Sequence, residues 1–161
     1  MKFLLVLPLV FIFSLSNGQD STDRKLISQI VISFITSWNN HDFSDMATYA
    51  TADLEWVNHF GTSLKGRDEV QKWNQTPHNT FLKTAHTTLE SMTIRFITQD
   101  VAIVTVIHQT SAFYPPDGID RGNNKQEGAR EIKSMVVVKQ NNKWLLCHNQ
   151  TTMIEDSTIQ K

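Results

Sequence analysis

Four long stretches with the composition of β-strands fill the second half of the chain and leave few choices for its fold. They cover residues 86–97, 101–113, 129–139 and 143–154 and are rich in Val, Ile, Thr and aromatic residues. The sequence QNNK, residues 140–143, is a tight hairpin signal, because Asn tolerates the left-handed backbone that such turns need. The last two stretches are therefore expected to pair antiparallel.

Residues before position 80 follow mainly helical spacing. From position 21 apolar residues return every three or four positions, as at Ile27, Ile30 and Phe34, and the polar sequence NNHD ends this pattern at residues 39–42. A shorter second helix is predicted over residues 44–50, and a third from Arg67 to near Pro77. Between them, residues 53–57 are predicted to form a strand and residues 61–66 a turn.

Helices that precede a meandering antiparallel sheet are typical of a single α+β domain. The helices are expected to pack on one face of the sheet, and strong curvature of that sheet would leave a cavity beside the first helix. The stretch 114–128, rich in Pro, Gly and Asn, is long for a connection between strands. It is expected to be either disordered or a lid over a site.

The N-terminus has the layout of a secretory signal peptide. Met1 and Lys2 precede an apolar run over residues 3–15, and the small residues Ser16 and Gly18 come before the expected cleavage point. The alternative is an uncleaved membrane anchor, but the run is shorter than the roughly 20 residues that a spanning helix needs. We therefore expect a signal peptide over residues 1–18, a mature domain over residues 19–161 without a stable membrane span, and a secreted or periplasmic location.

Charge and cysteine content exclude several classes of function. The formal net charge is −1 and there is no basic block, so no nucleic-acid partner is expected. Cys147 stands alone, which excludes an internal disulfide, and its apolar neighbours favour a buried, inert thiol. The histidines do not have the spacing that would place two of them on one face of an element, so neither a metal site nor a cofactor is expected.

Three stretches carry a resemblance to a known family. FITSWNNHDFSDMATYATADLEW, GTSLKGRDEV and VVVKQNNKWLLCHNQT resemble the nuclear-transport-factor-2-like superfamily and, within it, the SnoaL-like and SgcJ/EcaC-type small proteins. The resemblance implies a cone-shaped, cystatin-like α+β domain with a pocket between the helices and the concave sheet. It also implies a homodimer formed through the sheet. The fold hosts isomerases, cyclases, dehydratases and non-catalytic subunits, so it does not by itself decide the function.

The resemblance also points to one position in the strand over residues 53–57 and just beyond. Ketosteroid isomerase, a member of the superfamily, has its catalytic Asp three residues before a Gly, and the corresponding position here is Asn58, three residues before Gly61. An amide does not accept a proton at neutral pH, so the isomerase mechanism is not expected in its usual form. Asn58 is expected either to orient a ligand or to satisfy backbone groups at the strand end.

Strand alternation separates Asn58 from its neighbour His59. If Leu54 faces the interior, Trp56 and Asn58 face it too, and His59 faces the other side. The two are therefore not expected to act as a pair unless the turn at residues 60–61 redirects one of them. Eight residues are candidates for contact with a ligand: Trp38, Trp56, Asn58, His59, His86, His108, Arg130 and His148.

Strand alternation predicts which face of the sheet each candidate on the C-terminal strands shares with its neighbours. His108 shares a face with apolar residues 102, 104 and 106, and His148 shares one with residues 144 and 146; each is either a satisfied core residue or an acid/base group. Arg130 is expected on an otherwise apolar face, where it would bind a carboxylate ligand or pair with Asp53 or Glu90. The residues at 135 and 137 are expected on the second face, available to a dimer.

Two classes of function remain open. The first is an exported protein whose pocket binds an apolar or aromatic small molecule, with or without acid/base chemistry of the isomerase, cyclase or dehydratase type. The second is a non-catalytic dimeric module that binds a protein or a component of the cell envelope. A carboxylate that faces the pocket would favour the enzyme.

Overall fold

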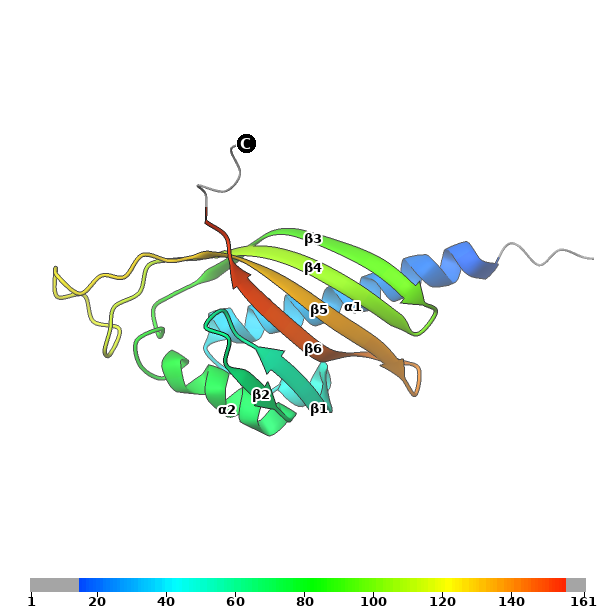
Figure 1. The fold of residues 1–161 in the computed structure, drawn as a ribbon, viewed down its shortest axis with the longest axis horizontal. Coiled ribbons are helices and arrows are strands. Elements are labelled where there is room, and N and C mark those ends of the chain that lie inside the picture. Colours follow the sequence, from blue (N-terminus) through cyan, green and yellow to red (C-terminus); the bar gives the residue numbers. More distant parts are fainter. Residues whose placement is uncertain (1–14, 156–161) are drawn as a thin grey trace, which may run out of the picture.

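The computed structural model describes residues 15–155 of the 161-residue chain. Most of the expected signal peptide therefore lies outside the described residues. Figure 1 shows the long helix α1 (Leu15–Asn40) along one face of a curved sheet, with the shorter helix α2 (Arg67–His78) beside the strands at one edge. Within residues 15–155, none of the helices combines the length and the apolar character that a membrane span requires.

Six strands form one sheet in the order β2-β1-β6-β5-β4-β3. The first two are β1 (Ala50–Val57) and β2 (Ser63–Lys65), and the other four are β3 (Thr87–Thr98), β4 (Val101–Thr110), β5 (Arg130–Gln140) and β6 (Lys143–Met153). These four confirm the strand-rich stretches of the sequence to within a few residues. Asn141 and Asn142 connect β5 to β6 with φ angles of 50° and 61°, as the hairpin signal predicted.

The sheet differs from the wholly antiparallel arrangement that was expected. All neighbouring strands are antiparallel except β1 and β6, which run parallel. The two are far apart along the chain, so no short hairpin constrains their direction. The sheet is therefore mixed, and β1 with β2 extends its edge over α2.

Three local predictions in the N-terminal part were wrong. The expected second helix is reduced to one 3-10 turn, Met46–Thr48, and α1 continues through residues 21–23 rather than beginning there. The expected turn over residues 61–66 contains β2, because Leu64 pairs with Trp56 and its side chain becomes buried. Pairing and burial override weak local preferences in such short segments.

The core lies between α1 and the concave face of the sheet. The apolar stripe on α1 is buried and consists of Ile27, Ile30, Val31, Phe34 and Trp38. Facing side chains from the sheet include Ala102, Val104 and Val106 of β4, together with Met135 and Val137 of β5. Burying each larger apolar side chain contributes roughly 1.5–3 kcal/mol, so this layer holds the helix on the sheet.

The faces of β5 are the reverse of those expected. Glu131, Lys133, Met135 and Val137 point into the domain, and Arg130 begins the series that faces outward. The strand carries apolar residues on both faces, so its composition alone did not show which face is buried. The consequence is that two charged side chains, Glu131 and Lys133, enter the interior.

A β-bulge changes the phase of β6. Val136 lies opposite His148 and Val137 lies opposite Leu146, so Cys147 is an extra residue in this strand. Trp144 and Leu146 face inward before the bulge, whereas Asn149 and Thr151 face inward after it. His148 therefore does not share the face of Trp144 and Leu146, in contrast to the expectation from simple alternation.

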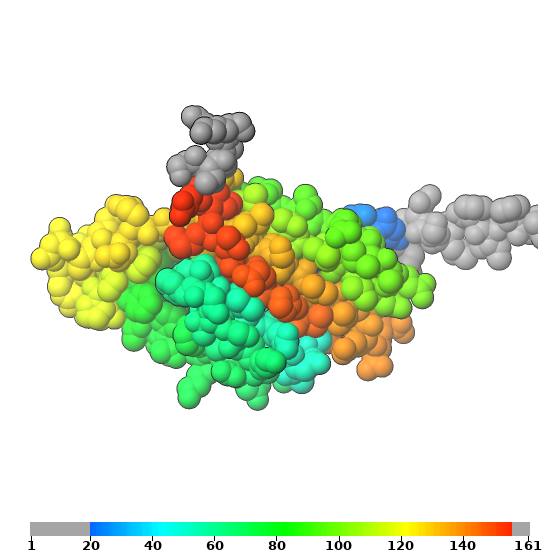
Figure 2. All heavy atoms as spheres, viewed as in Figure 1, coloured from blue at the N-terminus to red at the C-terminus, as the bar shows by residue number. Residues whose placement is uncertain are grey.

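The connection between β4 and β5 is an ordered excursion from the end of the sheet. Phe113 and Gln126 close its base through two backbone hydrogen bonds of 3.0 and 2.9 Å. Figure 2 shows the segment, coloured yellow, projecting beyond the sheet. Of the connection, only the flanking residues Phe113 and Ala129 line the cavity described below, so the projecting part does not cover the site as a lid in this structure.

Candidate functional site

A cavity of about 210 Å³ lies between the sheet and both helices. Six aromatic side chains line it: Phe34, Trp38, Trp56, Trp73, Phe81 and Phe113. Its polar groups include Asn58, His59, His78, Glu131, Lys133 and Thr151. A largely apolar cavity with a few converging polar groups is typical of a small-molecule site.

Glu131 is the centre of the polar groups. It is only 7% exposed, and its carboxylate contacts three basic side chains. Oε1 lies 2.5 Å from His59 Nδ1, and Oε2 lies 3.3 Å from His108 Nε2 and 3.9 Å from Lys133 Nζ. A buried carboxylate is costly unless it is paired, and these contacts supply the pairing.

Lys133 brings a positive charge into the same apolar cavity. Its ammonium donates a hydrogen bond of 3.0 Å to Thr151 Oγ1 and lies over the rings of Phe34 and Trp56, at 5.5 and 5.3 Å from their centroids. Burial lowers the pKa of Lys133 to about 8, against the opposing effect of Glu131. The side chain is therefore charged at neutral pH but close to its titration point.

His108 lies behind Glu131 and does not line the cavity. Its Nδ1 is 2.9 Å from Thr87 Oγ1, while Nε2 faces the carboxylate without an aligned hydrogen bond. Burial, and next the charge of Lys133, lower the pKa of His108 to about 3, so the ring is neutral at physiological pH. It supports Glu131 rather than contacting a ligand.

The end of β1 brings Asn58 and His59 to the same cavity. Asn58 Oδ1 accepts hydrogen bonds from the backbone N–H groups of Phe60 and Thr62, at 2.9 and 3.0 Å. Gly61 completes this turn with a φ of 81°, a backbone that suits glycine. The turn redirects His59, which is the exception that the sequence analysis named, so both side chains line the cavity despite strand alternation. The amide of Asn58 holds the turn and also lines the cavity.

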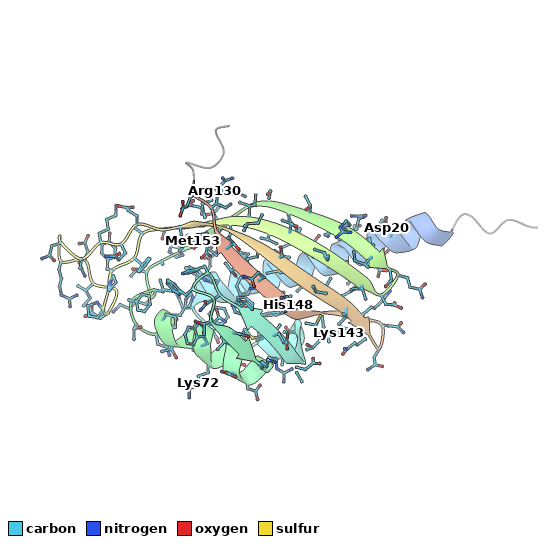
Figure 3. The ribbon with its side chains drawn as sticks, viewed as in Figure 1. Asp20, Lys72, Arg130, Lys143, His148 and Met153 are labelled. Atoms are coloured by element: carbon cyan, nitrogen blue, oxygen red, sulfur yellow. The ribbon has the colours of Figure 1, made fainter. Side chains whose placement is uncertain are left out.

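Besides His108, three of the eight candidates do not line the cavity. His86 is exposed just before β3. Arg130 lies on the outer face and pairs through Nε with Glu90 Oε2 at 2.7 Å, one of the two acids that were expected. His148 lies beside Glu55, with 3.8 Å between Nδ1 and Oε2. Figure 3 labels Arg130 and His148 at separate places along the strands. The candidates Trp38 and Trp56, by contrast, form part of the cavity wall.

Glu131 and Lys133 are the residues that sequence reasoning missed. They follow the same alternation as Met135 and Val137, so a correct choice of the buried face would have placed both charges inside. No local signal distinguished that face. Within residues 15–155 no group of three or more His, Cys, Asp or Glu side chains is arranged to hold a metal ion.

Comparisons with solved structures show the same fold in several proteins. A Caulobacter vibrioides protein with a cystatin-like fold has 21% identity over 84% of this chain and 92% of its own, with a TM-score of 0.75. A provisionally assigned scytalone dehydratase from Novosphingobium aromaticivorans has 14% identity over 86% and 89%, with a TM-score of 0.73. A type 2 hexachlorocyclohexane dehydrochlorinase (LinA) has 11% identity over 87% and 90%, with a TM-score of 0.74.

Sequence comparison gives the family. No curated protein matches the chain. The model of the SnoaL-like domain, however, matches residues 31–135, which is well over half of the chain. A protein of the nuclear-transport-factor-2-like superfamily from Salmonella enterica also shares the fold, with 15% identity over 88% of this chain and 98% of its own and a TM-score of 0.70. The chain therefore belongs to the SnoaL-like domain family of the nuclear-transport-factor-2-like superfamily.

Proposed function

We propose that this protein binds an apolar or aromatic small molecule in the cavity and removes a proton from one of its carbon atoms. The contact of 2.5 Å between His59 Nδ1 and Glu131 Oε1 carries the proposal. A carboxylate this close to Nδ1 favours the tautomer with its hydrogen on Nδ1, and in that tautomer the other ring nitrogen of His59 has a lone pair that can accept a proton. A carboxylate on the cavity wall is also the feature that separates an enzyme from a binding module.

Lys133 would stabilise the charge that this step creates. Removal of a proton beside a carbonyl group leaves negative charge on the oxygen, and a buried ammonium attracts that charge more strongly than it would in water. Lys133 lines the cavity close to Glu131, so the two charges could act on adjacent atoms of one ligand. We therefore propose a ligand with an apolar ring system and an oxygen atom beside the acidic C–H bond.

The proposed reaction class is elimination or isomerisation. Both begin with proton removal from carbon, and cyclisation follows the same first step in some substrates. The printed names of two structural neighbours, a dehydratase and a dehydrochlorinase, describe eliminations. They support the reaction class.

Deuterium exchange tests the proton transfer without knowledge of the natural substrate. The bicyclic ketone 2-tetralone has acidic hydrogens beside its carbonyl group, and their exchange in D2O is followed by proton NMR. We expect the purified protein to accelerate exchange over buffer. Glu131→Gln and His59→Gln should each lower the enzymatic rate by roughly 10²–10⁴-fold, the usual contribution of acid/base groups. Glu90→Gln, outside the cavity, is the matched control.

The same experiment addresses the alternative, a non-catalytic binding module. Fluorescence of 2-naphthol, an aromatic alcohol of similar size, would measure binding in parallel. Binding with no acceleration of exchange, and no difference between the wild type and Glu131→Gln, would refute the acid/base role and favour a binding module.

Export and dimerisation form a further part of the proposal. The N-terminal pattern supports export with cleavage after Gly18, and mass spectrometry of the protein from its native source should then show Gln19 as the first residue. Partly buried apolar side chains on the outer face of the sheet, among them Ile103, Ile107 and Ile132, support a dimer. Sedimentation as a monomer at micromolar concentration would count against it.

A further inference from the structure

We infer that His78 is a second proton-transfer group of the cavity and that His41 connects it to solvent. The inference rests on the proposed function for its role in turnover, but the arrangement of the two rings stands on its own contacts. His78 comes from the last turn of α2 and His41 from the end of α1. Neither ring belongs to the group around Glu131.

His78 is held rigidly in the cavity wall. The side chain is 3% exposed, and its ring packs edge-on against Trp38 and Phe43, with centroid distances of 4.5 and 5.0 Å. It lines the same cavity as His59 and Glu131. A ligand in the cavity therefore lies between basic groups of the sheet and an imidazole of the helical layer.

The two imidazoles share one hydrogen. His41 Nδ1 and His78 Nδ1 are 2.8 Å apart, so one nitrogen donates and the other accepts. When His41 donates, neutral His78 carries its hydrogen on Nε2 and offers an N–H donor to the cavity. When His78 donates, its Nε2 has a lone pair and accepts a proton. Passage of the hydrogen from His41 Nδ1 to His78 Nδ1, with release of the Nε2 hydrogen of His78 and uptake of a proton at Nε2 of His41, changes His78 from acid to base with both rings neutral.

Contacts between the two helices fix this pair. Gln75, one turn before His78, donates from Nε2 to the carbonyl oxygen of His41 at 2.8 Å and accepts at Oε1 from the backbone N–H of Phe43 at 3.0 Å. His41 itself has a left-handed backbone, with a φ of 55°, which turns the chain at the end of α1. The backbone around His41 is thus tied to α2 independently of the imidazole contact.

The electrostatic surroundings keep both rings neutral. Burial lowers the pKa of His78 to about 4, with a further effect from His41. Burial and the nearby His86 lower the pKa of His41 as well. The exposed ring of His86 lies 6.0 Å from that of His41, centroid to centroid, and is the titratable group on the outer side of the pair. Neutral rings can pass a proton onward without storing a charge in the wall.

In an elimination the pair would complete the proton balance. His59 takes the proton from carbon, and the electrons of that C–H bond form the new C=C bond. The C–O bond to a hydroxyl group breaks, and the departing oxygen takes the hydrogen from His78 Nε2, so that water leaves. His78 then receives no net charge, because the Nδ1 hydrogen passes from His41, which recovers a proton from solvent. The structure thus favours substrates with a hydroxyl group that faces α2.

NMR of the 15N-histidine-labelled full chain tests the arrangement directly. Between pH 6 and 8 we expect one hydrogen shared between the Nδ1 atoms of His41 and His78, with coupling across the hydrogen bond. Saturating 2-naphthol, with saturation shown by its fluorescence, should shift the resonance of His78 Nε2 and move that of His41 Nδ1 with it. Bound 2-naphthol that leaves His78 Nε2 unchanged would overturn the inference.

Exchange kinetics separate this inference from the proposed function. His78→Gln should lower the rate of 2-tetralone exchange by about 10–100-fold, and His41→Asn by less, since Asn tolerates the left-handed backbone but cannot relay a proton. If Glu131→Gln abolishes exchange and folded His78→Gln retains the wild-type rate, the role of His78 is refuted while the proposed function stands. If Glu131→Gln has no effect, the proposed function fails, and the NMR result alone decides whether the relay exists.

Discussion

Replacing Glu131 with Gln should destabilise the protein to an extent that depends on pH through Lys133. The carboxylate and the ammonium are 3.9 Å apart. Their attraction is about 4 kcal/mol at an effective dielectric constant of about 20. The variant does not lose this whole amount, because Lys133 can instead release its proton. Because the pKa of Lys133 in the wild type is about 8, releasing its proton at pH 7 costs about 1.4 kcal/mol. The variant is therefore expected to lose about this much free energy of unfolding at pH 7 through the lost Glu131–Lys133 attraction.

The loss of stability in the variant becomes smaller as the pH rises. In the variant the pKa of Lys133 falls further, because the charge of Glu131 no longer raises it. The unfolded chain, with an ordinary Lys pKa of 10.5, then binds one proton more than the folded variant already at pH 7. The variant therefore gains stability from pH 7 upward, whereas the wild type gains it only above pH 8. The difference between them should shrink by about 1.4 kcal/mol between pH 7 and pH 9.

Urea denaturation of both proteins at pH 7, 8 and 9 measures this difference. Glu90→Gln removes a carboxylate from the partly exposed pair with Arg130 and serves as the matched control. It should cost less than about 1 kcal/mol, with no change across this pH range. An equal loss for Glu131→Gln at pH 7 and pH 9 would refute the reasoning, since Lys133 would then not be the group that responds to Glu131.

Three further predictions concern the turn after β1, the base of the projecting segment and the buried histidines. Asn58→Ala removes two hydrogen bonds from the turn that carries His59 and should cost about 1–2 kcal/mol in urea denaturation. Asn58→Ala should also slow 2-tetralone exchange about tenfold or more. Asn58→Asp keeps the hydrogen-bond acceptor, so it should lower both the stability and the exchange rate by less. Equal losses of stability and of exchange rate in the two variants would contradict this account. Gly128→Ala would place a Cβ 1.8 Å from a backbone carbonyl oxygen at the end of β4, so a loss of about 2 kcal/mol or more is expected in thermal denaturation, and an unchanged melting temperature would show that the backbone there can shift freely. In the folded protein the pKa values of His78 and His108 are about 4 and 3. As the pH falls below 6.5, these two histidines therefore take up protons in the unfolded chain before they do so in the folded protein. The free energy of unfolding should fall by about 3 kcal/mol per ring at pH 4. His78→Gln should reduce this acid sensitivity, and an identical pH profile would argue against the buried neutral ring.

The sequence alone predicted the parts of the fold that depend on periodicity and turn chemistry. The stripe on α1 from Ile27 to Trp38 follows helical spacing because one face of a helix must meet the sheet. The four C-terminal strands and the Asn141-Asn142 hairpin follow from local composition, and the inward face of β1 from simple alternation. The resemblance to a family gave the curved sheet and the cavity.

Only the tertiary structure decided which polar side chains meet. β5 carries apolar residues on both faces, so packing against α1 determined that Glu131 and Lys133 turn inward. The bulge at Cys147 reversed the faces of β6, and the turn held by Asn58 brought His59 to Glu131. The bulge and the turn are local, but the meeting of His59 with Glu131 and the packing of β5 against α1 join segments far apart in the chain, and in a strand a shift of one residue exchanges the two faces. Local sequence patterns do not record such contacts, and the candidate site is built from them.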